Sequence, residues 1–406
     1  MSCVAVHSPV EFDIIYFIKY KHSDGRKADV RFCSTIQSVR SERKAQGNLG
    51  EGIAMISLID RVIGVFSTDM GIDLGTCNTL VCVRGQGIVL NEPSVVAVKK
   101  GTNQILMNGQ AVGSAAKDML GKCPGNIEAI RPMKDGVIAD FDITEAMIKY
   151  FIQKIHKRKG WFRPRVIVAH PSGITGVEKR AVLASAERAG ARQVFLVPEP
   201  IASGIGVGLP IQEPRGSMIV DIGGGTSEIA VLSLGAVVAC KSIRVAGDEL
   251  NDAIIKHCKE NYNLYIGENS AEKIKITIGS VSPLEKELTM EVRGGDVVTR
   301  MPRCIIVSSA EIRTALIEPV LKIVKAIKET LEMLPPEISA DLVESGVTLA
   351  GGGALLRGIK QAITREIDIP VTIAEDPLTA VARGTGVILD NLDRLRDSIE
   401  SSEDID

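Results

Sequence analysis

Two short stretches combine an aspartate, a glycine turn and small polar residues between apolar runs. They read Met70-Gly-Ile-Asp-Leu-Gly-Thr-Cys-Asn-Thr-Leu-Val-Cys-Val83 and Met218-Ile-Val-Asp-Ile-Gly-Gly-Gly-Thr-Ser-Glu-Ile-Ala-Val231. A tight turn between two strands directs several backbone N–H groups into one space, and such a nest suits phosphate oxygens. Asp73 and Asp221 are oxygen ligands of the kind that Mg²⁺ accepts together with water. Each stretch therefore predicts a phosphate-binding hairpin whose aspartate faces a metal.

The repetition of this motif is more informative than either copy alone. A single glycine turn between apolar runs is more often an ordinary hairpin than a ligand site. Asp73 and Asp221, however, occupy the same place in two similar stretches that are too far apart for a solenoid repeat. A third glycine turn, Gly346–Gly358, joins a strand to a predicted helix, whose first N–H groups favour an anion. We therefore expect two similar halves of the chain to hold one polyphosphate between them.

These stretches, in this order, resemble the superfamily of actins, sugar kinases and heat-shock chaperone ATPases. Within that superfamily the chain is most similar to the MreB family, the bacterial actins of cell shape. The resemblance covers about residues 55 to 395 and includes Leu90–Ser94, Ala129–Asp140, Val197–Pro200, Ile243–Asp248 and Asp376–Gly384. It implies an α/β protein with a duplicated ribonuclease-H-like actin fold. In that fold two lobes surround a nucleotide cleft, and each lobe carries a smaller inserted subdomain.

The resemblance also implies a ligand, ATP with Mg²⁺, and residues for each part of it. Asp73 and Asp221 would hold the metal, largely through water. The phosphates would contact Thr76, Cys77, Asn78, Gly224, Gly225 and Thr226; the third turn would contribute Gly352, Gly353, Ala354 and Leu355; the nucleoside would contact Glu272, Lys273, Ile274 and Lys275. Glu272 would reach the ribose hydroxyls. Without the resemblance, Glu272 and Lys275 would be interpreted as a solvated pair on one helix face.

Glu199 lies between two prolines, Pro198 and Pro200, directly after a predicted strand. Proline restricts the backbone, so the carboxylate would extend from a rigid strand end. A lone Glu is more often a surface charge, but hydrolysis of a γ-phosphate needs an oriented water, and a carboxylate can provide that. The resemblance assigns this catalytic role to Glu199, together with Thr226. Where the family usually has Glu-Glu-Pro, this chain has Pro198-Glu199-Pro200, so the first Glu of the pattern is absent.

An apolar helical face is predicted just before the first glycine turn. Ile59, Val62, Ile63 and Phe66 recur at the spacing of one side of a helix. Such a helix could pack on the core or lie in a membrane interface, and the resemblance favours a membrane anchor.

The only Trp of the chain stands in a second segment with properties suited to a membrane surface. Trp161 and Phe162 are flanked by Lys and Arg residues within His156–Arg165. Aromatic rings can enter the interface while cationic side chains meet anionic headgroups. A surface loop folded back onto the protein is the alternative, and a net charge of −2 gives little support to nucleic-acid binding. The resemblance again favours the membrane.

The expected domain boundaries follow from these assignments. Residues 1–54 lack sustained periodicity and are expected to be a disordered extension. The remaining parts are an amphipathic helix over 55–69, lobe I over 70–213 with a small subdomain near 98–133, lobe II over 214–382 with a small subdomain near 250–313, and a closing helix that returns to lobe I with an acidic tail over 383–406.

The stretch Leu49-Gly-Glu-Gly-Ile-Ala-Met55 suggests a further hypothesis about the extension. Gly and Glu codons are purine-rich, so these residues before a Met have the form of a translated ribosome-binding site. Met55 is then the true start; a genuine flexible tail is the alternative. Mass spectrometry of the native N-terminus distinguishes the two, because peptides from before Met55 would contradict the first.

Periodicity and breakers predict an alternation of strands and helices. Gly87–Val98 is predicted to be a strand pair that turns at Asn91–Pro93. The predicted helices are Thr144–Lys157, Val177–Ala189, Ile201–Gly208, Gly247–Tyr262 with Asp248 as its cap, Asn269–Ile278, Ala310–Leu334 and Pro377–Asp390. Further strands are expected over Val166–Ala169, Val194–Val197 and Thr348–Ala350 and within Val281–Ile306.

The composition fits a globular protein of two domains. The chain has 406 residues, of which 45% are hydrophobic and 24% charged, and it contains eight Cys. The Cys residues form no CxxC pair, so we expect reduced thiols in the cytoplasm rather than a disulfide or zinc framework.

The resemblance implies an actin-like ATPase that polymerises into filaments, lies on the inner face of the cytoplasmic membrane and directs cell-wall synthesis and cell shape. Its partners would be further copies of itself, anionic lipid and membrane proteins of the wall-synthesis complex, with no nucleic acid. A monomeric sugar or acid kinase and a heat-shock-type chaperone ATPase are the alternatives on the same fold. A kinase would need an Asp base beside a carbinol pocket, and a chaperone would need a peptide-binding domain.

Overall fold

The computed structural model describes residues 69–102, 104–106, 111–155, 163–392, 394–395 and 400–401. All described residues belong to one compact unit of the chain, Asp60–Asp406. Three predictions lie outside the described residues: the extension 1–54, the apolar face of Ile59, Val62, Ile63 and Phe66, and the loop with Trp161 and Phe162. In the described part, no helix has the length and apolarity needed to cross a membrane.

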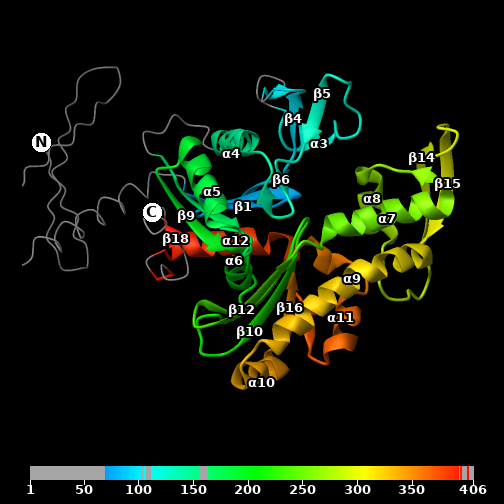
Figure 1. Cartoon of the computed structure of the whole chain (residues 1–406). Coiled ribbons are helices and arrows are strands. Elements are labelled where there is room, and N and C mark those ends of the chain that lie inside the picture. The colour runs from blue at the N-terminus through cyan, green and yellow to red at the C-terminus, as the bar shows by residue number, and fades with distance from the viewer. Residues whose placement is uncertain are drawn as a thin grey trace, which may run out of the picture. The chain divides into compact units, whose positions relative to one another are not determined.

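Two sheets of the same topology form the centres of two lobes (Figure 1). The six-stranded sheet of lobe I has the order β18-β9-β8-β1-β2-β3, and the five-stranded sheet of lobe II has the order β12-β11-β10-β16-β17. In each, an antiparallel meander is extended by two later strands that run parallel to its first strand; in lobe I the short β18 is added antiparallel at the edge. The bounds in lobe I are β1 (Met70–Leu74), β2 (Asn78–Val83), β3 (Gly87–Pro93), β8 (Arg165–His170), β9 (Gln193–Pro198) and β18 (Glu400–Ser401). Those in lobe II are β10 (Ser217–Ile222), β11 (Ser227–Ser233), β12 (Ala236–Ile243), β16 (Val347–Ala350) and β17 (Val371–Ile373). The expected duplication is therefore confirmed.

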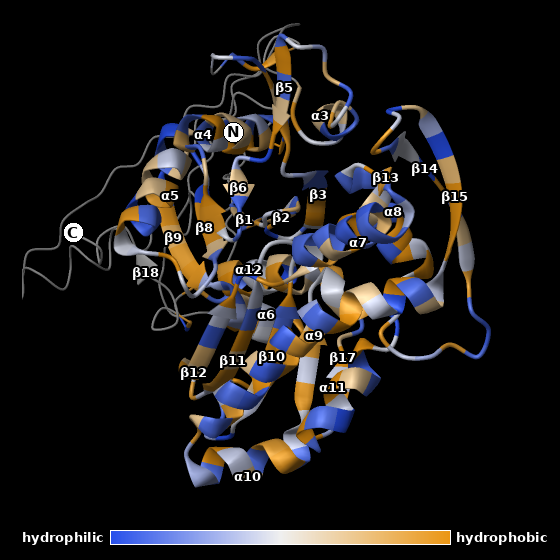
Figure 2. Ribbon diagram, turned by 45° about the vertical axis from the view of Figure 1, so that its right-hand side comes forward, coloured by the Kyte–Doolittle hydropathy of each residue, from blue (hydrophilic) through white to orange (hydrophobic). Residues whose placement is uncertain are grey.

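The central strands are buried on both faces. Every residue of β10 and β11 is buried, which explains why the motif around Asp221 is a continuous apolar run rather than an alternating one. Figure 2 shows hydrophobic strands inside each lobe. The helices around them have one hydrophilic and one hydrophobic face. Polar side chains that remain within such strands need a specific partner, since burying them unpaired is costly.

Helices α6 (Glu199–Gly206) and α12 (Ala380–Asp390) pack against each other where the two sheets meet. Their core combines side chains of both lobes, including Ile167 of β8 and Ile219 of β10. The approach is close because both helices carry glycine at the crossing: a Cβ on Gly206 would lie 2.8 Å from the backbone N of Gly384. The main parts of the lobes also contain α4 (Phe141–Ile155) and α5 (Gly176–Arg188) in lobe I, and α9 (Ser309–Glu332), α10 (Pro336–Ser345) and α11 (Ile359–Ile367) in lobe II.

Each lobe carries a smaller group of elements that packs on its hydrophobic core, and the group of lobe I also has a small core of its own around Ala97 and Ala116. In lobe I these are β4 (Val96–Lys99), α3 (Ser114–Lys117) and β5 (Ile127–Ile130), followed by the short pair β6 (Met133–Lys134) and β7 (Val137–Ile138). In lobe II they are α7 (Gly247–Tyr262), β13 (Leu264–Tyr265), α8 (Glu268–Ile278), β14 (Thr289–Asp296) and β15 (Pro302–Ser308). The inserted subdomains of the predicted fold class are present. The numerical boundaries given for the domains remain predictions.

The predicted strand pair over Gly87–Val98 is wrong. β3 pairs with β2 in the large sheet, whereas β4 pairs with β5 in a separate two-stranded sheet. The two strands are consecutive in the chain but belong to different sheets, because the residues between them contact the first glycine turn instead. Ser94 donates its backbone N–H to the carbonyl oxygen of Cys77 at 2.9 Å and its hydroxyl to that of Gly75 at 2.6 Å.

The predicted helices are present, with three corrections at their starts. Asp248 does not cap α7, whose N-cap is Ala246 without a side-chain hydrogen bond. Helix α4 begins at Phe141, ahead of the predicted Thr144, because the carboxylate of Asp140 accepts the backbone N–H of Ile143 at 3.0 Å.

The third correction concerns the closing helix. Its predicted first turn is a separate 3-10 turn, η2 (Pro377–Thr379), and α12 starts only at Ala380. The carbonyl oxygen of Pro377 accepts the backbone N–H of Gly351 at 2.8 Å, so it is not available to continue a helix.

Candidate functional site

The glycine turns that follow β1 and β10 contact each other between the lobes. A Cβ on Gly224 would lie 2.8 Å from the Cβ atom of Cys77 and 3.2 Å from its backbone N. One on Gly225 would lie 2.8 Å from Oγ1 of Thr76 and 3.0 Å from Cα of Asp135. Any side chain at either glycine would push the turns apart, so glycine is required here for the approach of the lobes. The half-buried Asn78 begins β2 directly after the first turn.

Asp73 and Asp221 occupy matching positions in the two sheets. Asp73 of β1 is paired in register with Ala169 of the parallel strand β8, and Asp221 of β10 with Ala350 of β16. Burial raises the pKa of Asp73 to about 7, and the charge of Asp221 adds to this. Burial also raises the pKa of Asp221 to about 6, although a 2.9 Å hydrogen bond from Ser203 Oγ opposes the increase. The two carboxyl groups that the sequence predicted to share one ion therefore interact electrostatically.

Glu199 is the first residue of α6 and joins the same acidic group. The strand β9 ends at Pro198, which is the N-cap of the helix, so the carboxyl group starts from the junction of a strand and a helix. Burial raises the pKa of Glu199 well above its usual range, and the charges of Glu228, Asp73 and Asp221 contribute in that order. Thr226, assigned with it to catalysis, is 8% exposed and lies against the other lobe, where a Cβ on Gly136 would be 2.7 Å from its methyl carbon.

Glu228 is a member of this group that the sequence did not reveal. It lies on β11 with 1% of its surface exposed. Its carboxylate accepts the backbone N–H of Ser172 in lobe I at 3.1 Å and the hydroxyl of Ser242 on β12. Burial raises the pKa of Glu228, and these hydrogen bonds lower it in part. One pattern in the sequence could have indicated this role of Glu228: a Glu that follows Ser227 inside an otherwise apolar strand.

The third glycine turn lies against the end of β10. Gly351 has φ 77, and a Cβ there would clash with the carbonyl oxygen of Ile222 and with the carboxylate of Asp221. Gly352, Gly353, Ala354 and Leu355 form one 3-10 turn, η1, whereas the helix predicted to start here, α11, begins later at Ile359. Ala354 is buried and the side chain of Leu355 is exposed. The turn therefore approaches the site through its backbone and not through a helix start.

The predicted nucleoside segment lies on α8, but its four residues face different ways. Ile274 is fully buried in the core of lobe II, and Lys273 is exposed. Lys275 donates from Nζ to the carbonyl oxygen of Gly247 at 2.7 Å, and burial lowers its pKa. Glu272 pairs with Lys117 of lobe I, with 3.0 Å between Oε2 and Nζ. Glu272 and Lys275 therefore do not form the intrahelical pair that was the alternative; each has a partner outside α8.

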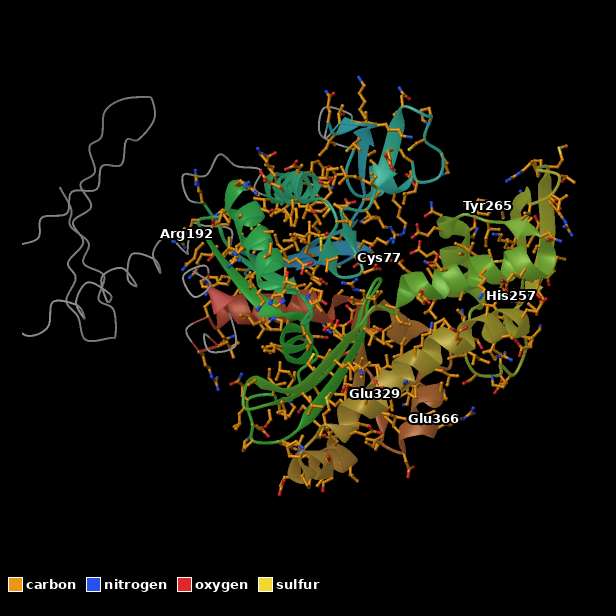
Figure 3. The ribbon with its side chains drawn as sticks, viewed as in Figure 1. Cys77, Arg192, His257, Tyr265, Glu329 and Glu366 are labelled. Carbon is orange, nitrogen blue, oxygen red and sulfur yellow. The ribbon has the colours of Figure 1, made fainter. Side chains whose placement is uncertain are left out.

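Cys77 connects the first turn with α7 (Figure 3). Its Sγ atom lies 3.5 Å from Oδ1 of Asp248, and Nη1 of Arg131 lies 3.7 Å from the sulfur. Burial raises the pKa of the Cys77 thiol to about 11, with Asp248 contributing, so the thiol is neutral near pH 7. Arg131 is a second residue that sequence reasoning did not single out, because it stood inside the matching segment without a role.

These residues fit a magnesium-bound polyphosphate. In the described part of the chain, no three His, Cys, Asp or Glu side chains are grouped to bind a metal directly. Mg²⁺ usually keeps several waters and takes only one or two carboxylates, which Asp73 and Asp221 can supply. A divalent cation would also offset the repulsion that raises the pKa of Asp73. The turns at Thr76 and Gly225, which contact each other, are of the kind whose backbone N–H groups can bind phosphate oxygens.

The family model and the relatives named below carry the same two names, MreB and Mbl. The family model described as MreB/Mbl protein matches residues 67–397. The cell shape-determining protein Mbl of Bacillus cereus is 51% identical over 331 residues, which are 82% of this chain and 98% of the relative. The cell shape-determining protein MreB of Escherichia coli (strain K12) is 51% identical over 338 residues, which are 83% of this chain and 97% of the relative.

Solved structures agree with the fold. The crystal structure of MreB5 of Spiroplasma citri bound to ADP has a TM-score of 0.77 at 37% identity and covers 82% of this chain and 98% of that one. The same protein is also known bound to AMPPNP. A MamK double helical filament has a TM-score of 0.68 at 22% identity over 80% of this chain and 99% of that one, which supports the fold alone.

Proposed function

The chain belongs to the MreB/Mbl protein family, and from this premise we propose that it is a cytoskeletal ATPase of cell shape. In this proposal it binds ATP and Mg²⁺ between its lobes, hydrolyses the ATP and polymerises into filaments on the inner face of the cytoplasmic membrane. There it would direct cell-wall synthesis together with membrane proteins of the wall-synthesis complex. The actin-like fold and relatives that determine cell shape support this proposal.

The observation that carries the proposal is the pair of aspartates at matching strand ends of the two lobes. Asp221 is buried and Asp73 is half-buried, and the negative charge of Asp221 raises the pKa of Asp73 because like charges repel. A protein retains such an arrangement only if something offsets the repulsion or if the strain has a use. A magnesium ion held largely through water supplies the positive charge, and it would neutralise phosphate oxygens beside the two turns.

The turns would hold the phosphates by their backbone. Thr76, Cys77 and Asn78 follow β1, and Gly224, Gly225 and Thr226 follow β10; because the two turns contact each other, both lobes would offer their N–H groups to one ligand. The turn of Gly352, Gly353, Ala354 and Leu355 would complete the site from the side of Asp221. On α8, Glu272 and Lys275 have partially buried polar ends that could contact the nucleoside. Ile274 could do so only through its backbone, since its side chain belongs to the core.

Glu199 would orient the attacking water and accept its proton. It stands at the start of α6, where the charges of Asp73 and Asp221 contribute to raising its pKa, and in this proposal a water near the phosphates lies within its reach. To act as a base, Glu199 must be ionised. A metal at Asp73 and Asp221 would offset two of the negative charges that raise its pKa. Thr226, buried beside Gly136 of the other lobe, would help to position the same water.

The test is electron microscopy and co-sedimentation of the purified full chain on anionic liposomes. We expect filaments on the lipid with ATP and Mg²⁺, and release of phosphate in the same sample. A protein that stays monomeric with ATP, Mg²⁺ and anionic lipid, and that transfers phosphate to a sugar or a carboxylic acid, would overturn the proposal in favour of a kinase. ATP-dependent release of an unfolded peptide without filaments would favour a chaperone.

A further inference from the structure

The guanidinium group of Arg131 connects lobe I with lobe II. Arg131 follows β5 directly, and its Nη1 atom lies 3.1 Å from each carboxylate oxygen of Asp248. Its Nη2 atom lies 2.5 Å from Oε1 of Glu268. The same Nη1 atom is 3.7 Å from Sγ of Cys77 in the first glycine turn. We call Arg131, Asp248 and Glu268 the interlobe bridge.

Both acidic members of the bridge are tied to the proposed nucleotide site. The backbone N–H of Asp248 donates to the carbonyl oxygen of Gly224 at 2.8 Å, so Asp248 is fixed to the second glycine turn. Glu268 is the first residue of α8. The same helix carries Lys275, which donates to the carbonyl oxygen of Gly247 at 2.7 Å. A displacement of Arg131 would therefore remove one contact of lobe I with the turn and one with the helix at the same time.

The bridge is less exposed than ordinary surface ion pairs. The side chains of Arg131, Asp248 and Glu268 are 17%, 28% and 40% exposed. Fully exposed pairs contribute little, whereas charge-assisted hydrogen bonds from one guanidinium to two carboxylates are stronger. The Nε atom of Arg131 is buried without a hydrogen-bond partner. If the guanidinium lost its contacts with Asp248 and Glu268 while the lobes stayed closed, water could not replace these partners. A buried charge without hydrogen-bond partners is unfavourable. The charges therefore favour closed lobes.

A second ion pair crosses at the same side of the molecule. Lys117 of α3 and Glu272 of α8 lie 3.0 Å apart, with 32% and 28% of their side chains exposed. The contact joins the small subdomains of the two lobes and supports the same closed arrangement. It relies on one flexible lysine rather than on a planar guanidinium with two carboxylate partners, so we expect it to be the weaker of the two.

We propose that the interlobe bridge keeps the lobes closed over a bound nucleotide and determines how fast the nucleotide leaves. The inference rests on the proposed function, because it requires a nucleoside triphosphate between the lobes. Release then needs Arg131 to separate from Asp248 and Glu268, since these contacts hold both the second turn and α8 against lobe I. Arg131 is a positioning residue: it acts through the two lobes and not on the reacting atoms.

The experiment measures dissociation of a fluorescent ATP analogue from the full chain by stopped flow with excess unlabelled ATP. We expect Arg131→Gln to accelerate release about tenfold, because the lobes open more easily without the bridge and most differences in affinity appear in the dissociation rate. The matched control is Arg313→Gln. The Arg313 side chain is 16% exposed and pairs with Glu287 within lobe II, so its loss removes a similar ion pair that does not cross between the lobes. Release from the control should change less than about twofold.

Exchanging the charges of Arg131 and Asp248 tests whether the contact between these two side chains controls the release of the nucleotide. Arg131→Glu alone should accelerate release, and the double variant Arg131→Glu with Asp248→Arg should restore most of the slow rate. If the single change accelerates release and the exchange restores nothing, Arg131 contacts the nucleotide directly and the bridge is not the cause.

If Arg131→Gln does not fold, judged by its thermal unfolding, Asp248→Asn and Glu268→Gln remove the bridge from the other lobe. Unchanged release in those variants would overturn the inference. A wild-type chain that does not bind the analogue would instead overturn the proposed function.

Discussion

Gly224 of lobe II faces Cys77 of lobe I so closely that a Cβ on Gly224 would lie 2.8 Å from the Cβ atom of the cysteine. The lobes therefore approach each other at a point where neither can accept an additional carbon atom. This contact lies between the two turns that we propose to hold the phosphates. Its tightness makes the approach of the lobes sensitive to single substitutions.

Gly224→Ala should separate the turns and weaken ATP binding. The added carbon meets Cys77 on its Cβ and its backbone, and a backbone contact cannot be relieved by rotating a side chain. We expect the dissociation constant for ATP to rise at least about tenfold, which corresponds to 1.4 kcal/mol. Isothermal titration calorimetry measures this change directly.

Cys77→Gly should restore part of the affinity in the Gly224→Ala background, because it removes the carbon and sulfur atoms that the alanine meets. The control is Gly176→Ala at the start of α5, where an added Cβ meets nothing within 4 Å. Equal loss of affinity in Gly176→Ala and Gly224→Ala would mean that the contact between the turns has no special role.

Asp73→Asn should stabilise the nucleotide-free protein at alkaline pH. The folded-state pKa of Asp73 is about 7, above its ordinary value of 3.8, so the folded protein binds this proton more tightly than the unfolded chain. Ionisation of Asp73 therefore costs stability: the cost begins near pH 4, grows as the pH rises and is complete above about pH 7. Asn cannot ionise and avoids this cost. The melting temperature without Mg²⁺ should rise more at pH 8 than at pH 5, with about 2–4 °C for each kcal/mol in a large domain.

The same variant should lose the stabilisation that Mg²⁺ and ATP give to the wild-type chain, because a ligand stabilises only the state that binds it. The exposed Asp118→Asn is the control for removal of one negative charge and should leave both readouts unchanged. A melting temperature of Asp73→Asn that varies with pH as in the wild type would contradict the raised pKa of Asp73.

Glu199→Gln should abolish hydrolysis and spare binding. Glutamine has nearly the same shape but cannot accept a proton, so we expect turnover of ATP to fall by a factor of about 10² to 10⁴. The affinity for ATP should remain within about threefold, or improve, since one buried negative charge is removed. A phosphate-release assay measures turnover, and Glu187→Gln on the exposed side of α5 is the control. Normal turnover in Glu199→Gln would exclude this residue as the base.

Trp161→Ala combined with Phe162→Ala should abolish attachment to anionic liposomes and leave nucleotide binding unchanged. The rings would otherwise enter the lipid interface, and their loss should reduce the bound fraction at least about tenfold in a co-sedimentation assay. Tyr265→Ala, a 62% exposed aromatic on β13, is the control and should bind lipid normally. If nucleotide binding falls instead, the loop belongs to the core.

The parts of the site that the sequence alone determined are those built within one short stretch. A strand, an aspartate and a glycine turn specify their own geometry, because the apolar run and the freedom of glycine act over a few residues. Asp73, Asp221 and the turns at Thr76 and Gly224 could therefore be located without coordinates. The doubling of the motif was also enough to predict two similar sheets, whose strand orders match except for the additional edge strand β18 of lobe I.

Tertiary structure alone decided which distant residues join that site. Glu228 became part of the acidic group because Ser172 of lobe I reaches it, and Ile274 became core because α8 packs against its own lobe. Asp248 was predicted as a helix cap, but its carboxylate pairs with Arg131, which is 117 residues away in the chain. Local patterns cannot reveal such partners, because an ionic contact between segments far apart depends on how the two lobes close. That closure is a property of the whole fold and leaves no periodicity in either segment.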